Sequence, residues 1–214
     1  MSAQVEGQWE LHEARAWARA RLDEAGVDSV DADVRELLEW ACDVTTQWDL
    51  PTVLDPEQAE KLRGGVAEKA LRIPLQHVTG RMFFRSLVLT AMPGVFIVRP
   101  ETEVVAGAAI EAAREVMDGG GGVVLTADLC TGSGAIAACV AKEVPGARVV
   151  AVEISETAAS LARENCERLV PGRVEVIHAD ATDPLVLHDL NGQVDVVVSN
   201  PPYVPAGAVE DTET

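Results

Sequence analysis

VVLTADLCTGSGAIAA, from Val123 to Ala138, is the stretch that decides the fold. An apolar run typical of a buried strand reaches Asp128, and the small-residue turn Cys130–Gly134 and an alanine-rich helical sequence follow it. Nucleotide-type cofactors need this order of strand, glycine loop and helix, because glycine lets a ligand approach closely and the helix presents free N–H groups beside the turn. Two glycines alone are also typical of an ordinary strand-to-helix turn, so the rest of the chain has to decide between the two.

Composition limits the class of protein. The chain has 214 residues, 48% of them hydrophobic, and a formal net charge of −18, so one medium or two small domains are expected. The acidity argues against diffuse binding to a nucleic-acid backbone, which depends on Lys and Arg. No apolar run is long enough to cross a membrane, and the N-terminus has acids but no apolar signal segment. Without any C-x-x-C pair, the cysteines predict a reducing cytoplasm and no zinc site: Cys42, Cys130, Cys139 and Cys166.

Residues 1–72 predict a small N-terminal helical bundle, which we expect to recognise a partner. Apolar residues recur at three- and four-residue spacing from Leu11 to Leu22, and Asp55-Pro56 is a strong signal for the start of a later helix. Helical spacing also favours a place in the core for all four tryptophans, which are Trp9, Trp17, Trp40 and Trp48.

Residues 73–98 predict a linker and a β-hairpin. The segment 73–80 is bounded by proline and glycine, and the strands 81–91 and 94–98 are expected to flank a turn at Met92-Pro93-Gly94. Arg99-Pro100-Glu101-Thr102-Glu103 then opens a helix that we expect to reach about Met117, with its acids favourably placed at the N-terminus.

Residues 99–214 predict an α/β domain with a parallel sheet. Apolar strands alternate with helices, as in sheets that are covered by helices. Ligands of such sheets bind beyond the carboxyl ends of the strands. Polar residues end four of the expected strands, and they are Asp128, Glu153, Asp180 and Asn200.

The residues at these strand ends favour a cofactor that contains ribose and adenine. Glu153 can accept hydrogen bonds from both ribose hydroxyls, and this is the role that we favour. The alternative is that it is only an acid at a helix N-terminus. Asp180 and Ala181 follow the third strand, where a side chain can reach an adenine amino group. The loop lacks the third glycine of G-x-G-x-x-G and the Gly-Lys of a P-loop, so we predict a cofactor without phosphate, S-adenosylmethionine. Asp128 is then expected near the cationic end of the cofactor.

Asn200-Pro201-Pro202-Tyr203 is the most specific tetrapeptide of the chain. Two prolines fix φ and remove two N–H donors, so the local carbonyls can face a ligand. Asn200 offers an amide oxygen and Tyr203 a flat ring, which together suit a planar –NH2 group whose nitrogen is aimed at an electrophilic methyl group. A plain turn is the alternative. We find no G-x-S-x-G motif and no expected metal site, and we interpret Cys130 as a space-filling residue rather than a nucleophile.

With these motifs the sequence closely resembles the HemK family, S-adenosylmethionine-dependent methyltransferases of the glutamine amide in the Gly-Gly-Gln motif of class I peptide release factors. The segments that carry the resemblance are Pro74–Gly80, Arg99–Glu103, Asp128–Gly134, Glu153 and Asn200–Tyr203. It implies a helical domain joined by a hairpin to a Rossmann-like methyltransferase domain. It also implies that the glutamine amide is held by Asn200–Tyr203, and the cofactor by Cys130, Thr131, Gly132, Ser133, Gly134, Glu153 and Ala181.

The sequence departs from the family pattern at a few positions. Cys130 stands where the family often has glycine, Val98 where it often has proline, and Glu153 where it usually has aspartate. Sheets of this family have further strands after the Asn-Pro-Pro-Tyr segment. We therefore expect either that the sequence ending at Thr214 is incomplete, or that the protein is truncated there and its activity is in doubt. Three alternatives stay open: a ribosomal-protein glutamine substrate, an adenine amino group in a nucleic acid, and an inactive cofactor-binding protein that docks a partner. The charge of −18 and the Arg-Pro-Glu-Thr-Glu segment argue against the adenine substrate.

Overall fold

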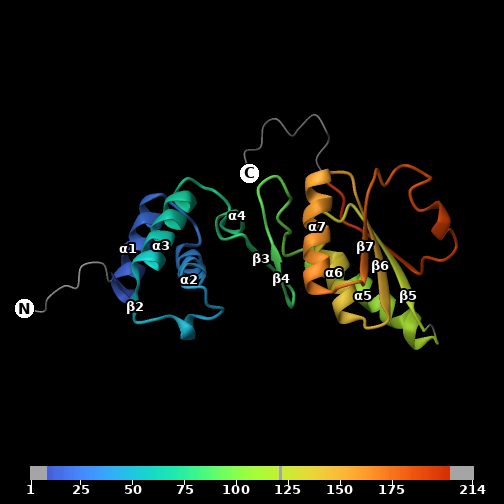
Figure 1. Ribbon diagram of the computed structural model, residues 1–214, viewed down its shortest axis with the longest axis horizontal. Helices are drawn as coiled ribbons and strands as arrows, with labels where there is room; N and C mark the ends of the chain where they lie inside the picture. Colours follow the sequence, from blue (N-terminus) through green and yellow to red (C-terminus); the bar gives the residue numbers. More distant parts are fainter. Residues whose placement is uncertain (1–8, 121, 203–214) are drawn as a thin grey trace, which may run out of the picture. The chain divides into compact units, whose positions relative to one another are not determined.

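The computed structural model of the chain describes residues 9–120 and 122–202. The chain divides into two compact units, Met1–Gly80 and Arg81–Thr214. Figure 1 shows the helices of the first unit in blue to green and the sheet of the second unit in yellow to red.

The first unit is a helical bundle with a minimal two-stranded sheet. Its elements are β1 (Trp9–Glu10), α1 (Leu11–Glu24), α2 (Val30–Ala41), the 3-10 helix η1 (Gln47–Asp49), β2 (Val53–Leu54), α3 (Pro56–Ala70) and α4 (Leu75–Thr79). The core is formed by fully buried leucines from all three long helices and from β2, namely Leu22, Leu37, Leu38, Leu54 and Leu62. Burial of these aliphatic side chains is the main stabilising contribution to such a bundle.

Local signals explain how α3 begins and packs. Asp55 and Gln58 form a capping box, and Pro56 occupies the first turn, which confirms the predicted helix start. In mid-helix, a Cβ atom added to Gly65 would lie 2.8 Å from the Trp40 ring and 2.9 Å from Leu37. Gly65 therefore lowers the helix propensity of α3, but it allows α3 to approach α2 closely.

Two expectations for this unit were wrong. Trp48 is 85% exposed, because it lies in η1, outside the helical face that its spacing suggested. The segment expected to be a linker forms α4, whose end is marked by Gly80 at φ 67°. The other three tryptophans are half-buried, and the rings of Trp9 and Trp17 meet edge to face at 5.2 Å.

The second unit begins with a hairpin whose turn differs from the prediction. β3 (Arg81–Phe84) pairs with β4 (Leu87–Thr90), so the turn is Arg85-Ser86 and not Met92-Pro93-Gly94, and residues 94–98 form no strand. Arg85 takes a left-handed φ of 50°, which arginine rarely adopts. Its backbone N–H donates to Glu103 Oε1 at 2.9 Å, and its guanidinium forms a two-pronged ion pair with Glu143 at 2.7 and 2.9 Å. Partners distant in the sequence therefore hold a turn that the local sequence does not signal.

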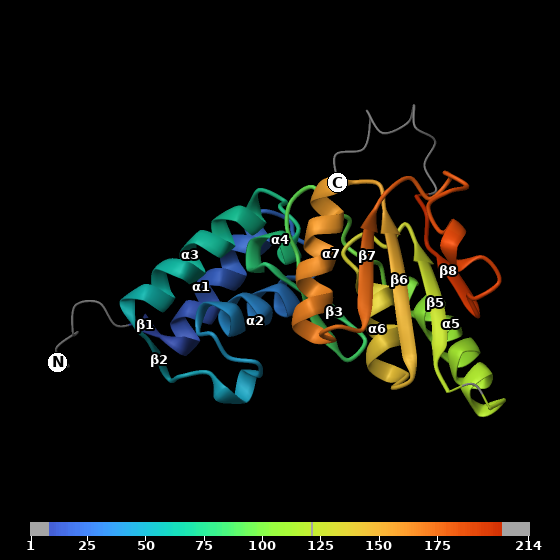
Figure 2. The same cartoon turned by 45° about the vertical axis from the view of Figure 1, so that its right-hand side comes forward.

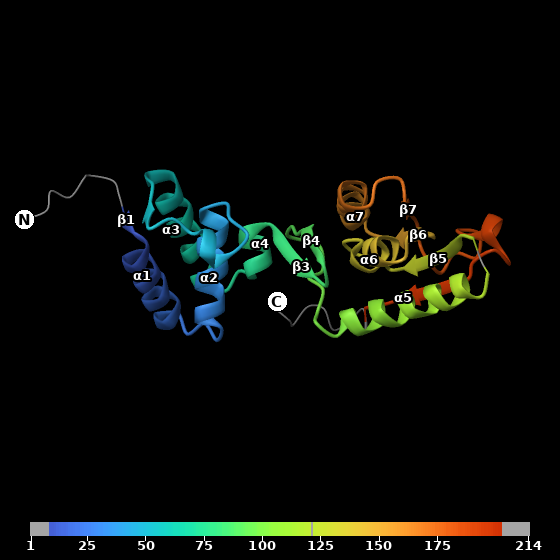
Figure 3. The same cartoon turned by 90° about the horizontal axis from the view of Figure 1, so that it is seen from below.

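A four-stranded parallel sheet forms the centre of the second unit. The strands are β5 (Val124–Leu129), β6 (Ala147–Glu153), β7 (Val174–His178) and β8 (Val196–Ser199), and their order is β7-β6-β5-β8 (Figure 2). The helices α5 (Thr102–Asp118), α6 (Ala135–Glu143) and α7 (Glu156–Leu169) lie side by side along one face of the sheet (Figure 3). This arrangement confirms the predicted α/β class.

The core of the second unit includes the hairpin. Met82, Phe84, Leu87 and Leu89 are buried in the same cluster as the strands of the sheet and the alanine-rich face of α6.

Across residues 9–120 and 122–202, no helix has the length and apolar character that crossing a membrane requires.

Candidate functional site

The carboxyl ends of the parallel strands bring the predicted site residues together. In the register of the sheet, Leu129 of β5 lies opposite Val152 of β6 on one side and Ser199 of β8 on the other. Cys130, Glu153 and Asn200 are the residues that directly follow these three neighbours. Residues far apart in the sequence thus share one edge of the sheet, where open α/β sheets bind their ligands.

The glycine loop between β5 and α6 has the backbone geometry of a ligand cradle. Cys130, Gly132 and Gly134 all have positive φ, at 61°, 59° and 82°. A Cβ atom added to Gly132 would meet nothing within 4 Å, so the chain keeps open space at this position. A Cβ atom added to Gly134 would lie 3.0 Å from Cys166 Sγ and 3.2 Å from Ala162 on α7. Gly132 therefore leaves room for a ligand, whereas Gly134 serves helix packing.

Asp128 is fully buried and braces this loop. Its Oδ2 accepts hydrogen bonds from the Thr131 hydroxyl at 2.5 Å and from the Ala137 N–H at 3.1 Å. Burial raises the pKa of Asp128 to about 7, and the hydrogen bonds only partly offset this effect. In the described part of the chain, Asp128 Oδ1 and the nearby Ser133 Oγ are buried without a hydrogen-bond partner. Buried atoms of this kind are places where a bound ligand can supply the missing partner.

Glu153 connects the glycine loop to the start of α7. Its Oε2 accepts from the Gly132 N–H at 2.8 Å, and its Oε1 accepts from the Ser155 N–H at 2.9 Å. Each carboxylate oxygen has a second lone pair that can accept from a ribose hydroxyl. The helix-terminal role and the ribose role are therefore compatible in one side chain.

Asp180 and Ala181 follow β7, two strands away from β5. Asp180 is exposed, and its Oδ1 accepts from the Thr182 N–H at 2.8 Å and the Thr182 hydroxyl at 2.7 Å. These hydrogen bonds hold the pKa of Asp180 below its ordinary value. Ala181 is half-buried. Asp180 therefore shapes the turn that follows β7.

Cys130 has no features of a nucleophile. Burial raises the pKa of its thiol above the ordinary value, so the thiol is protonated at neutral pH. No group of three or more His, Cys, Asp and Glu side chains arranged for a metal ion occurs within the residues that the structure describes.

Asn200 follows β8 and contacts the start of α5. Its Nδ2 donates a hydrogen bond to Thr102 Oγ1 at 3.2 Å. Thr102 is 4% exposed, whereas Pro201 and Pro202 are exposed. Tyr203, which we expect to supply a flat ring, lies outside the described residues.

Sequence reasoning missed two side chains at the site, Thr102 and Asn165. Asn165 on α7 is fully buried, and its Oδ1 accepts from the Thr90 N–H at 2.8 Å while its Nδ2 donates to the Ser133 carbonyl at 3.1 Å. A polar residue on the otherwise apolar face of α7 was the signal that could have identified Asn165. This single amide joins the end of the hairpin to the glycine loop.

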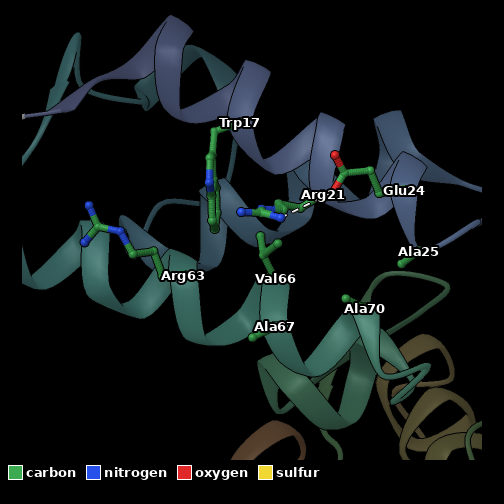
Figure 4. A pocket seen from close by; sticks show the side chains of 8 residues that line it. All are labelled: Trp17, Arg21, Glu24, Ala25, Arg63, Val66, Ala67 and Ala70. Atoms are coloured by element: carbon green, nitrogen blue, oxygen red, sulfur yellow. Dashed lines mark hydrogen bonds and ion pairs between the residues drawn. The ribbon is translucent and has the colours of Figure 1, made fainter.

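A separate depression lies on the first unit, between α1 and α3 (Figure 4). It has a volume of about 370 Å3, its floor is mainly apolar, and the Trp17 ring and the Arg21 and Arg63 guanidinium groups surround it. Arg21 forms an exposed ion pair with Glu24 at 3.3 Å, and Arg63 forms one with Glu60 at 3.5 Å.

Two family models match the chain. The "PrmC N-terminal domain" matches residues 13–80, and the "Methyltransferase small domain" matches residues 115–213. Each match lies within one of the two units of the structure.

Several curated proteins are similar over most of the chain. A release factor glutamine methyltransferase of Streptomyces coelicolor is 48% identical over 89% of this chain and 64% of its own length. The corresponding protein of Corynebacterium glutamicum is 39% identical over 95% of this chain and 71% of its own length. A 4-amino-L-phenylalanine/4-methylamino-L-phenylalanine methyltransferase of Streptomyces pristinaespiralis is 35% identical over 92% of this chain and 66% of its own length. The chain thus spans less than two thirds of the first of these relatives.

Proposed function

We propose that this chain, which belongs to the release factor glutamine methyltransferase family, transfers a methyl group from S-adenosylmethionine to the side-chain amide nitrogen of the glutamine in the Gly-Gly-Gln motif of class I peptide release factors. The observation that carries the proposal is the meeting of the glycine loop, Glu153 and Asn200 at one edge of a parallel sheet. The second unit has the Rossmann-like fold of S-adenosylmethionine-dependent methyltransferases.

The glycine loop and Glu153 suit the proposed cofactor. Gly132 leaves open space and Gly134 orients the start of α6, while the Glu153 oxygens can accept from the ribose hydroxyls. Asp180 and Ala181 line the adjacent turn, where we propose that the adenine lies. When bound, S-adenosylmethionine supplies an electrophilic methyl group on a sulfonium sulfur. We assign no role to a metal ion in this chemistry.

Asn200 and the two prolines would hold the acceptor. An amide nitrogen is a poor nucleophile because its lone pair is delocalised into the carbonyl group, so orientation has to supply much of the rate. The Asn200 oxygen and the local backbone carbonyls can accept both hydrogens of the –NH2 group and direct the nitrogen along one axis, with the Tyr203 ring proposed against its face. Near-ideal alignment of two reactants is worth up to roughly 7–11 kcal/mol of the barrier.

The partner and the compartment are parts of the same proposal. We expect the class I release factor to be the partner, without direct nucleic-acid or membrane binding, since the net charge is −18. All four cysteines are free thiols, which supports a reducing cytoplasm as the location.

Mass spectrometry of the Gly-Gly-Gln peptide tests the proposal directly. Purified protein is incubated with S-adenosylmethionine and a class I release factor, and a mass increase of one methyl group on the glutamine is expected. Parallel reactions contain a ribosomal protein, duplex DNA or 4-amino-L-phenylalanine, the last because one relative is named for it. Methylation of one of these acceptors with none on the release factor overturns the substrate assignment, and cofactor binding without any transfer supports the inactive docking protein.

A further inference from the structure

We propose that Thr102 is a positioning residue that sets the orientation of the Asn200 carboxamide. This inference rests on the proposed function, because it concerns how the acceptor amide is held. It gives the Arg99-Pro100-Glu101-Thr102-Glu103 segment a role in the reaction, in addition to opening α5.

The contact between the two side chains carries the argument. Thr102 Oγ1 accepts from Asn200 Nδ2 at 3.2 Å, although the residues are 98 positions apart in the sequence. The two edges of a carboxamide have nearly the same shape but opposite hydrogen-bonding character. With the Nδ2 edge held by Thr102, the Oδ1 edge is the one that can accept from the –NH2 group of a substrate. A rotation of the amide would present hydrogen-bond donors to a group that is itself a donor.

Thr102 is itself firmly held, as a positioning residue needs to be. Its N–H donates to the Arg99 carbonyl at 2.9 Å, and the Glu103 N–H donates to the Pro100 carbonyl at 3.1 Å, so the segment is a series of tight turns. Glu103 in turn accepts from the Arg85 N–H at 2.9 Å. A β-branched side chain has few χ1 rotamers, and Thr102 is 4% exposed, so its hydroxyl has little freedom to move.

Three substitutions separate positioning from packing. Thr102→Val keeps the shape but removes the acceptor, and Thr102→Ser keeps the hydroxyl but removes a methyl group. Thr126→Val is the matched control, because Thr126 is fully buried in the same unit and its hydroxyl has no partner among the described residues. In release-factor methylation assays we expect Thr102→Val to lower kcat about 10- to 100-fold. Thr102→Ser should restore kcat to within about threefold, Thr126→Val should match the wild type, and the Kd for S-adenosylmethionine should be the same in all four proteins. Wild-type kcat in Thr102→Val overturns the inference.

Nuclear magnetic resonance gives a readout that does not depend on activity. The Asn200 side-chain –NH2 signals, assigned by their loss in Asn200→Ala, should show slowed hydrogen exchange in the wild type and in Thr102→Ser but faster exchange in Thr102→Val. Equal exchange in all three proteins overturns the positioning role. If the wild type leaves release factor unmodified, the proposed function fails, whereas a changed exchange rate in Thr102→Val still supports the orientation of Asn200 by Thr102.

Discussion

The Gly132 backbone N–H donates a 2.8 Å hydrogen bond to Glu153 Oε2, and so the turn after β5 is tied to the end of β6. The other Glu153 oxygen accepts from the Ser155 N–H at 2.9 Å. The carboxylate thus fixes the glycine loop before any ligand arrives. A preformed loop binds its ligand with a smaller loss of conformational entropy than a mobile one.

The first prediction concerns the substitution Glu153→Gln. One end of a glutamine amide cannot accept a hydrogen bond, so either Gly132 or Ser155 loses its partner, and a neutral group replaces the charge. We expect the Kd for S-adenosylmethionine to rise about tenfold or more, since hydrogen bonds to charged groups are worth roughly 1.5–3 kcal/mol. Isothermal titration calorimetry measures this change. Glu175→Gln, at an exposed position on β7, is the control, and an unchanged Kd in Glu153→Gln would contradict the role of the carboxylate.

The second prediction concerns pH. The folded-state pKa of Asp128 is about 7, above its ordinary value of 3.8, so the folded state favours the protonated acid. Below about pH 4 the acid is protonated in both the folded and the unfolded state, so it does not lower the free energy of unfolding. As the pH rises toward about 7 the unfolded state ionises first and the free energy of unfolding falls, by at most ~4 kcal/mol at 1.36 kcal/mol per pKa unit. Asp128→Asn removes this titration but retains an oxygen for Thr131 and Ala137. Denaturant unfolding at several pH values should therefore show a smaller decline for Asp128→Asn than for the wild type, and parallel curves would show that Asp128 is not the titrating group.

The third prediction distinguishes two glycines of one loop. Gly134→Ala places a Cβ atom 3.0 Å from Cys166 Sγ and 3.2 Å from Ala162, at a φ of 82°, so we expect a loss of about 2 kcal/mol or more in unfolding free energy. Gly132→Ala meets nothing within 4 Å and should cost only about 1 kcal/mol, for its positive φ. Cofactor binding should show the reverse order of sensitivity, because the open space at Gly132 is where we propose that the cofactor lies. Thermal unfolding with and without S-adenosylhomocysteine measures both effects, and equal losses of binding would refute the separation.

The fourth prediction concerns the buried amide of Asn165. Asn165→Ala leaves the Thr90 N–H and the Ser133 carbonyl without their partner, and each unsatisfied buried group costs about 1–3 kcal/mol. We expect a total loss of about 3–5 kcal/mol in unfolding free energy. Asn191→Ala, at an exposed position after η2, should change stability by less than about 0.5 kcal/mol. Similar losses in the two variants would show that the Asn165 network contributes little.

The sequence was sufficient where local pattern determines structure. The predicted bounds of α6, Ala135–Glu143, are those observed, because glycines mark its start and an alanine-rich run continues it. The strand ends expected at Asp128, Glu153 and Asn200 lie within one residue of the observed ends at Leu129, Glu153 and Ser199, since apolar runs and the first polar residue after them are local features.

The features that the sequence did not reveal depend on contacts between distant residues. Arg85-Ser86 carries no turn signal, and Glu103 and Glu143 hold this turn from 18 and 58 positions away. Asn165 meets Thr90 across 75 positions, and Thr102 meets Asn200 across 98. Single-sequence patterns contain no information on such pairings, because they arise only when the sheet assembles.

The contacts of Arg85 with Glu103 and Glu143 determine where a fragment that contains only the second unit should begin. Because the turn is fastened to α5 and α6, and Met82, Phe84, Leu87 and Leu89 fill the interior beneath it, the hairpin is an integral part of the second unit. A recombinant fragment that begins at Arg99, the first residue of the Arg-Pro-Glu-Thr-Glu segment, lacks the hairpin. Its apolar core would therefore be exposed where the hairpin packs, and Glu143 would lose its ion pair with Arg85. A fragment that begins at Arg81 retains the hairpin and is the better choice for expressing the second unit alone.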